Sequence, residues 1–274
     1  MNQHLVLKRD AKASVFTHLF SLNKYKRELY LSFYPRDANI KDEEIETYTL
    51  SRIFTNIQIN DLGLLVKDTM LVLVEAQSIW TMNILPRMFE YLAESFNRYV
   101  HDTDQNIYGS KKVYLPRPEL YVLYTGDKTI KQKTISFKTE FFKNDCSVDV
   151  IVKVITLNNS SNVLKEYIMF TKVLDDNNKK LGYTKDSIVE TINYCVNHNI
   201  LKEYLNEYKK EVYNIMISLY DQETATQMYG RSQFAEGKAE GIEQGRKTLL
   251  QDLYKKGLIT KDQAIELSNG TLIL

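Results

Sequence analysis

Two short apolar runs joined by three polar residues are the feature that most constrains the fold. The runs cover residues 62–66 and 70–74, and Lys67, Asp68 and Thr69 separate them. Apolar runs of this length on either side of a polar turn indicate buried strands. With the turn at these three residues, Val66 faces Met70 and fixes the register of the whole pair. The sequence therefore predicts an antiparallel hairpin inside the core.

Each run has a carboxylate beside it, where apolar residues would otherwise be expected. In the predicted register Asp61, just before the first run, lies directly opposite Glu75, just after the second. Directly opposed residues of an antiparallel pair have Cβ atoms about 5 Å apart. Two carboxylates that close repel each other unless a cation lies between them or one takes up a proton. A slip of one residue would turn Asp61 away from Glu75, so the site depends on this register.

The residue types at this hairpin indicate a particular chemistry. Oxygen ligands alone suit a hard ion such as Mg²⁺ or Mn²⁺. Gln77 lies two residues after Glu75 and therefore shares its face of the strand, where its amide can orient a water or a phosphate oxygen. This combination is typical of metal-assisted phosphodiester hydrolysis.

Around these residues the chain resembles the Rpn group of recombination-promoting nucleases and transposases, within the PD-(D/E)XK nuclease superfamily. The resemblance rests on Asp61-Leu62, on Val74-Glu75-Ala76-Gln77-Ser78 and on Leu85-Pro86-Arg87-Met88-Phe89-Glu90-Tyr91. Further support comes from Asp10 with Phe16 and Leu19-Phe20, from residues 121–128 and from the glycine-spaced charged tail.

The resemblance implies a fold, an activity and roles for named residues. The fold would be a restriction-endonuclease-like α/β core, with a mixed sheet flanked by helices and an all-helical extension after it. The activity would be Mg²⁺-dependent DNA endonuclease chemistry, linked to recombination or transposition. Asp61 and Glu75 would hold the metal, and Gln77 would stand where most of the superfamily has lysine. Without that lysine, the metal would carry more of the charge stabilisation.

Several further residues are candidates for supporting roles. Glu28 or Asp10 would supply an additional acidic ligand, as the first helix does in some members of the superfamily. Arg87 and Tyr91 lie one turn apart on the helix predicted after the hairpin and are candidates to contact phosphates or support the site, with ordinary solvated surface positions as the alternative. Lys128 and Lys131 belong to a basic run suited to a DNA backbone, although an ordinary solvated face remains the alternative.

The rest of the chain predicts a mixed α/β order followed by helices. One or two helices are expected over residues 13–34, a helix from Pro86 onward, and strands over 120–124 and 148–157. From residue 162 the apolar spacing is helical. The sequence thus predicts a nuclease core at 1–158, a helical subdomain at 159–234 and a charged helical tail at 235–274.

Three glycines mark the predicted tail. Gly237, Gly241 and Gly245 recur every four residues in a stretch crowded with charge. Each glycine disfavours a helix by about 1 kcal/mol, so this helix is expected to need a partner. A homodimer seam and a solvated connector both remain open. Thr260 is predicted to cap a short final helix.

Composition narrows the setting of the protein. A chain of 274 residues with 43% hydrophobic content can bury a full core. It has no apolar stretch near the roughly 20 residues that cross a bilayer and no secretory signal pattern, so we expect a cytoplasmic protein without a membrane partner. The four histidines and two cysteines show no zinc-ligand spacing.

The near-neutral charge keeps a second function open. The formal net charge is +1, so affinity for DNA would have to come from local patches. The alternative to an active nuclease is a catalytically weak or inactive DNA-binding or assembly protein that retains the nuclease fold. Metal binding that depends on Asp61 would distinguish the two.

Overall fold

The computed structural model describes residues 3–49 and 62–268. The chain divides into two compact units, Met1–Tyr220 and Asp221–Leu274. The three-part division into 1–158, 159–234 and 235–274 stays a prediction, because compactness alone does not delimit functional modules.

A mixed six-stranded sheet forms the centre of the first unit, in the order β1-β2-β3-β4-β6-β5. The β1, β2 and β3 strands are antiparallel to one another, β3, β4 and β6 are parallel, and β5 is antiparallel to β6. The bounds are β1 Ile45–Thr47, β2 Leu62–Val66, β3 Met70–Gln77, β4 Arg117–Tyr124, β5 Thr134–Ser136 and β6 Ile151–Ile155.

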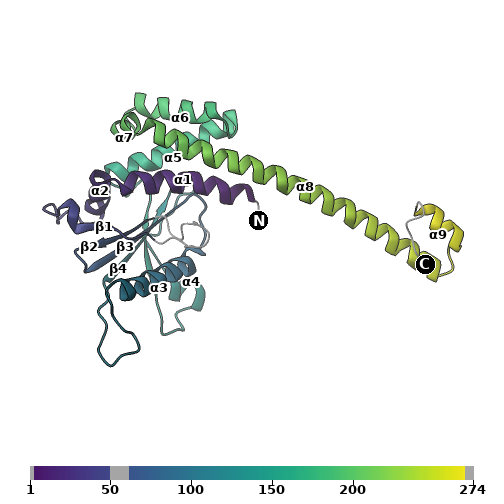
Figure 1. Cartoon of the computed structure of the whole chain (residues 1–274), viewed down its shortest axis with the longest axis horizontal. Helices are drawn as coiled ribbons and strands as arrows, with labels where there is room; N and C mark the ends of the chain where they lie inside the picture. The colour runs from purple at the N-terminus through teal and green to yellow at the C-terminus, as the bar shows by residue number, and fades with distance from the viewer. Residues whose placement is uncertain (1–2, 50–61, 269–274) are drawn as a thin grey trace. The chain divides into compact units, whose positions relative to one another are not determined.

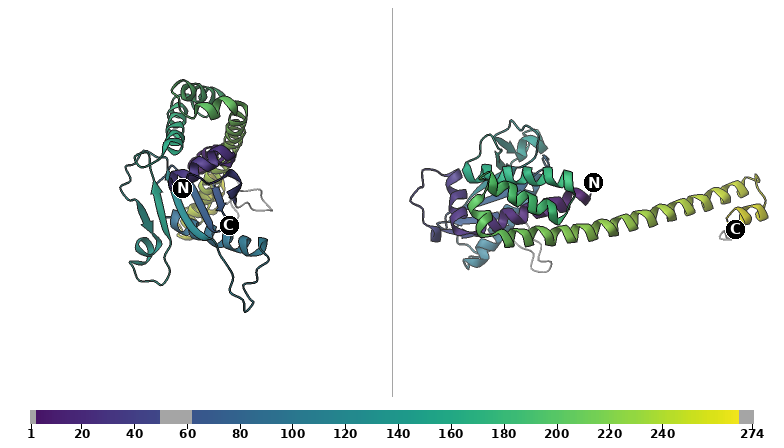
Figure 2. Two further views of the ribbon diagram at one scale, coloured as in Figure 1. Left: turned by 90° about the vertical axis from the view of Figure 1, so that its left-hand side faces the viewer. Right: turned by 90° about the horizontal axis from the view of Figure 1, so that it is seen from above.

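Helices cover both faces of this sheet (Figure 1; Figure 2, left). One face carries α3 (Ile84–Asp102) and α4 (Phe137–Phe142), and the other carries α1 (Gln3–Ser21), α2 (Asn23–Phe33) and α5 (Asn162–Leu181). Further helices of this unit are η1 (Asp42–Glu44), α6 (Lys185–Asn197), α7 (Lys202–Glu207) and the first turns of α8 (Lys209–Lys255). The predicted α/β class, a mixed sheet flanked by helices, is confirmed.

The β3 strand has a core on each side. Leu71 and Leu73 pack in the cluster beneath α3, whereas Val72 and Val74 pack in the larger cluster with α1, α2 and α5. A strand covered on both faces reads as a continuous apolar run rather than an alternating one. This explains why a polar residue inside β3 requires a specific partner.

The predicted hairpin and its register are confirmed for the described residues. Leu62 pairs with Val74 and Val66 with Met70. Between the strands, Lys67 and Asp68 adopt φ values of 50° and 51°. Left-handed turn residues match the right-handed twist of a two-stranded ribbon. Position 61 lies outside the described residues.

The strand predictions differ from the structure around residue 149. The predicted strand at 148–157 is confirmed only over β6, and β5 lies in the lysine-rich segment for which no strand was predicted. The Asp149 carboxylate accepts hydrogen bonds from Ser136 Oγ at 2.7 Å and from the Lys138 N–H at 2.9 Å. These bonds hold Asp149 against the start of α4, and the strand begins only at Ile151.

In the second unit the predicted final helix is confirmed as α9 (Lys261–Leu267). The N–H of Gln263 donates to Thr260 Oγ1 at 3.2 Å, and the N–H of Thr260 donates to Gln263 Oε1 at 2.8 Å. This reciprocal capping box satisfies donors that a helix start leaves unpaired. Gly257, at φ +70°, ends α8 in the left-handed conformation that glycine adopts without strain.

The glycines of α8 give a direct test of whether that helix has a packing partner. A Cβ added at Gly241 would meet nothing within 4 Å. We expect Gly241→Ala to stabilise the helix by about 1 kcal/mol, because alanine has the higher helix propensity. Thermal melts of the full chain followed by circular dichroism would measure this. Gly257→Ala is the matched control and should destabilise; a loss at Gly241 as well would show that another helix packs against the glycines.

Candidate functional site

Two polar residues lie buried at the carboxyl end of β3. Glu75 and Gln77 continue the side of the strand that Leu71 and Leu73 begin, and their exposed fractions are 1% and 3%. They pair with Val122 and Tyr124 of the parallel strand β4. In open α/β sheets, ligands bind outside the carboxyl ends of parallel strands. The two predicted residues are therefore placed where such a sheet commonly carries its site.

One arginine connects these two side chains. Arg87 Nη1 lies 3.0 Å from Glu75 Oε1, and Arg87 Nη2 donates to Gln77 Oε1 at 3.0 Å. The Arg87 side chain is 24% exposed, so the cluster is not sealed from solvent. The structure thus brings together three of the residues that the sequence indicated.

The start of α3 places this arginine. Leu85 and Met88 are fully buried and fix the face of the helix that meets the sheet. Pro86 has no backbone N–H to leave unpaired, and the Arg87 N–H donates to Asn83 O at 3.4 Å. A cation in the first helical turn is disfavoured by the helix dipole, so the buried carboxylate of Glu75 compensates for its position.

The amide of Gln77 has an unused donor. Its Nε2 is buried and has no hydrogen-bond partner among the described residues. Exchanging the amide oxygen and nitrogen would set two donors against each other at Arg87, so the orientation follows from the arginine. A buried donor without an acceptor costs about 1–3 kcal/mol. An oxygen atom of a ligand at this point would satisfy it.

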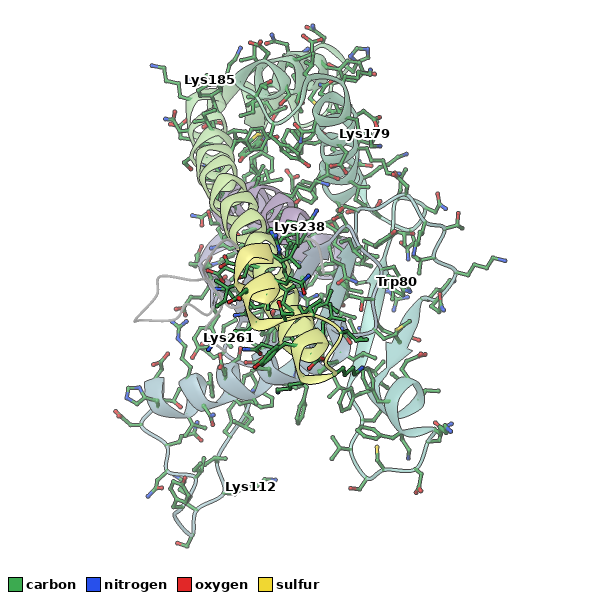
Figure 3. The ribbon with its side chains drawn as sticks, turned by 90° about the vertical axis from the view of Figure 1, so that its right-hand side faces the viewer. Trp80, Lys112, Lys179, Lys185, Lys238 and Lys261 are labelled. Atoms are coloured by element: carbon green, nitrogen blue, oxygen red, sulfur yellow. The ribbon has the colours of Figure 1, made fainter. Side chains whose placement is uncertain are left out.

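The chain segments that follow β3 and β4 touch beside the cluster. The N–H of Thr125 donates to Gln77 O at 2.9 Å, and a Cβ on Gly126 would lie 2.1 Å from Ser78 O. Trp80, labelled in Figure 3, packs edge to face on Tyr124 with centroids 5.6 Å apart. Glycine is required at position 126 by this close approach, which holds the two segments together.

A cavity of about 120 Å³ lies at the carboxyl ends of β4 and β6. Lys128 and Lys172 contribute to its lining, and Lys172 Nζ is 3.8 Å from an Asp127 oxygen. Lys128 and Lys131 are exposed, as expected of residues that contact a phosphate backbone or simply face solvent. Their role stays a prediction.

The remaining predicted residues lie elsewhere. Tyr91 is 6% exposed and belongs to the core under α3, so it supports the helix and does not face solvent. Glu28 lines a separate cavity of about 370 Å³ between α2, α5 and α7. Burial there raises its pKa, and the positive charge of nearby Lys24 offsets part of this effect. The structure does not bring Glu28 to Glu75. Asp10 lies in α1, with its side chain outside the described residues.

The described donors fit a hard metal ion in part. Glu75 supplies a carboxylate at the site, whereas Asp61, its predicted partner, lies outside the described residues. Within the described ranges, no three His, Cys, Asp or Glu side chains gather as a metal-binding group. Magnesium binding therefore stays a prediction that rests on the pairing expected from the sequence.

Sequence reasoning missed the contact between Arg87 and Glu75. The sequence does carry a signal for this contact: Arg87 stands on the first turn of the helix that follows the strand with Glu75. Periodicity shows which side of the helix is apolar, but the side chain opposite Arg87 depends on how α3 lies across the sheet.

Taken together, the fold and the cluster define an α/β protein with polar side chains buried at the carboxyl end of a central strand. Comparison with protein-family models, curated proteins and solved structures finds no match to this chain. In the part of the chain that the structure describes, no helix combines the length and apolar character of a membrane crossing.

Proposed function

We propose that this protein is a metal-dependent DNA endonuclease, with a restriction-endonuclease-like core and a role in recombination or transposition. The observation that carries the proposal is the pair of buried polar side chains on β3. Glu75, a carboxylate at 1% exposure, and Gln77, whose amide has a donor without a partner among the described residues, both lie at the carboxyl end of β3. An unsatisfied buried polar group calls for an explanation, and functional sites are where such groups cluster.

The residues have distinct roles in the proposed reaction. Glu75 and Asp61 would hold Mg²⁺ or Mn²⁺, which when bound lowers the pKa of a water molecule and polarises the scissile phosphate. The Gln77 Nε2 would donate to the attacking water or to a phosphate oxygen. Glu75 and Gln77 take their positions from the buried strand β3.

Arg87 is a candidate to replace the positive charge of the lysine that is missing at position 77. Its guanidinium lies within hydrogen-bonding distance of Gln77 Oε1, so a permanent positive charge stands next to the amide. Arginine binds phosphate oxygens through two parallel donors. Once released from Glu75, Arg87 would supply from α3 the cationic side chain that the strand lacks.

Cleavage of supercoiled plasmid tests the proposal. We expect nicking by the full chain in Mg²⁺ or Mn²⁺ and none in EDTA. Asp61→Asn should lower the rate at least about 100-fold, because losing a metal ligand removes several kcal/mol of transition-state stabilisation. Asp68→Asn is the matched control, since Asp68 is exposed in the hairpin turn and asparagine tolerates its left-handed conformation. Nicking that survives Asp61→Asn, or its absence from the wild type, would overturn the assignment.

The observed ion pair favours one alternative. Because Arg87 already neutralises Glu75, the cluster can be stable without a metal. The alternative is a catalytically weak or inactive DNA-binding or assembly protein, including a homodimer built through the helical tail. Such a protein would need no metal at this cluster. DNA binding that is indifferent to EDTA, without nicking, would support this second function.

A further inference from the structure

The Glu75 carboxylate has a cation beside it in the described structure. A carboxylate with 1% exposure is strongly destabilised unless a positive charge or hydrogen bonds compensate for its lost hydration. The guanidinium of Arg87 supplies positive charge at 3.0 Å from Oε1. The proposed divalent ion would supply the same compensation to the same group.

The two cations compete for this carboxylate. A divalent ion held by Glu75 would bring a second positive charge close to the Arg87 guanidinium, whose Nη1 lies 3.0 Å from Oε1 of the same carboxylate. Like charges a few ångströms apart repel strongly where water is excluded. A metal and Arg87 on the same carboxylate would therefore weaken each other's binding.

We infer that Arg87 is the counter-ion of Glu75 in the metal-free protein. It weakens divalent-ion binding until nucleic acid draws the guanidinium away. The inference rests on the proposed nuclease function and adds to it a form of regulation. In this arrangement the metal and the nucleic acid help each other to bind, because both favour the state in which Arg87 has left the carboxylate.

The position of Arg87 suits a phosphate as the competing partner. Its side chain is 24% exposed and lies in the first turn of α3, where the helix dipole favours an anion and disfavours a cation. The N–H groups of Leu85 and Arg87 are already bonded to Met82 O and Asn83 O, and Pro86 has none. An incoming phosphate at this turn would therefore depend on the guanidinium.

Gln77 would respond to the same movement. Its Oε1 accepts from Arg87 Nη2, while its Nε2 is buried without a partner. When the arginine withdraws, the amide loses the contact that fixes its orientation and becomes free to turn its donor toward a bound oxygen. The unpaired Nε2 donor of Gln77 therefore belongs to the state in which Arg87 contacts Glu75 and Gln77.

The test is the Mn²⁺ affinity of the full chain without DNA, measured by titration calorimetry. Arg87→Met keeps the length of the side chain and removes its charge, so we expect Mn²⁺ to bind about tenfold more tightly or better. Arg87→Lys should stay near the wild type, since it retains a positive charge. Arg98→Met is the control, because Arg98 lies on the same helix and pairs with Asp102.

A thermal-shift measurement keeps the test valid if Arg87→Met is less stable. Saturating Mn²⁺ should raise the melting temperature of this variant more than that of the wild type. Equal or weaker Mn²⁺ binding by Arg87→Met would overturn the inference and leave the proposed function standing. The absence of Mn²⁺ binding in the wild type and in every variant would remove both.

Discussion

Replacing Glu75 by glutamine is expected to abolish metal-dependent nicking and to destabilise the fold at the same time. The neutral amide is a poor ligand for Mg²⁺, so we expect a loss of activity on the order of 1,000-fold. It also leaves the Arg87 guanidinium without its carboxylate. Removing one member of a fully buried ion pair costs about 3–5 kcal/mol; because Arg87 is 24% exposed and can turn to solvent, we expect about 2–3 kcal/mol.

Urea unfolding and plasmid nicking would measure the two effects separately. Glu140→Gln is the control, because Glu140 is an exposed carboxylate on α4. The double variant Glu75→Gln with Arg87→Met should recover part of the lost stability without recovering activity, since it leaves no unpaired charge. Full nicking by Glu75→Gln would mean that the reaction does not use this carboxylate.

Gly126→Ala is expected to destabilise the first unit by about 3 kcal/mol, because the added methyl group overpacks the end of the sheet. Its Cβ would lie 2.1 Å from Ser78 O and 2.4 Å from Tyr124 Oη. The first of these is a backbone atom, so the segment after β3 must shift to make room. That segment includes the backbone bond from Thr125 to Gln77, and nicking should fall along with stability.

The melting temperature and the urea midpoint would show the effect of Gly126→Ala. Gly109→Ala is the matched control, since its nearest contact would be Asn106 O at an ordinary 3.4 Å. A free energy of unfolding for Gly126→Ala within about 0.5 kcal/mol of the wild type, the usual range for surface changes, would show that the two segments separate easily.

Local pattern was sufficient to predict the hairpin. Strand length, the polar turn and the strict alternation of side chains together fix which residues of β2 and β3 face one another. The same alternation places Glu75 and Gln77 on one side of the strand, as the structure confirms. These predictions succeed because they need only the geometry of neighbouring residues.

Contacts between distant elements were not available from the sequence. Glu28 is a candidate because the first helix supplies an acidic ligand in some members of the resembled superfamily, yet α2 packs on the face of the sheet opposite α3, with α5 and α7 around it. Periodicity gives the apolar side of a helix but not the face of the sheet that it covers. Likewise, the hydrogen bonds of Asp149 to Ser136 and Lys138 join residues more than ten positions apart and shorten the predicted strand.

The shortness of the two edge strands affects how the protein aggregates at high concentration. The edge strands β1 (Ile45–Thr47) and β5 (Thr134–Ser136) are only three residues long. Short edge strands, one bearing the exposed Glu46, offer few backbone groups to a strand of another molecule. We therefore expect the described part of the sheet to resist edge-to-edge aggregation, so that association between copies relies on side chains and not on a continued sheet.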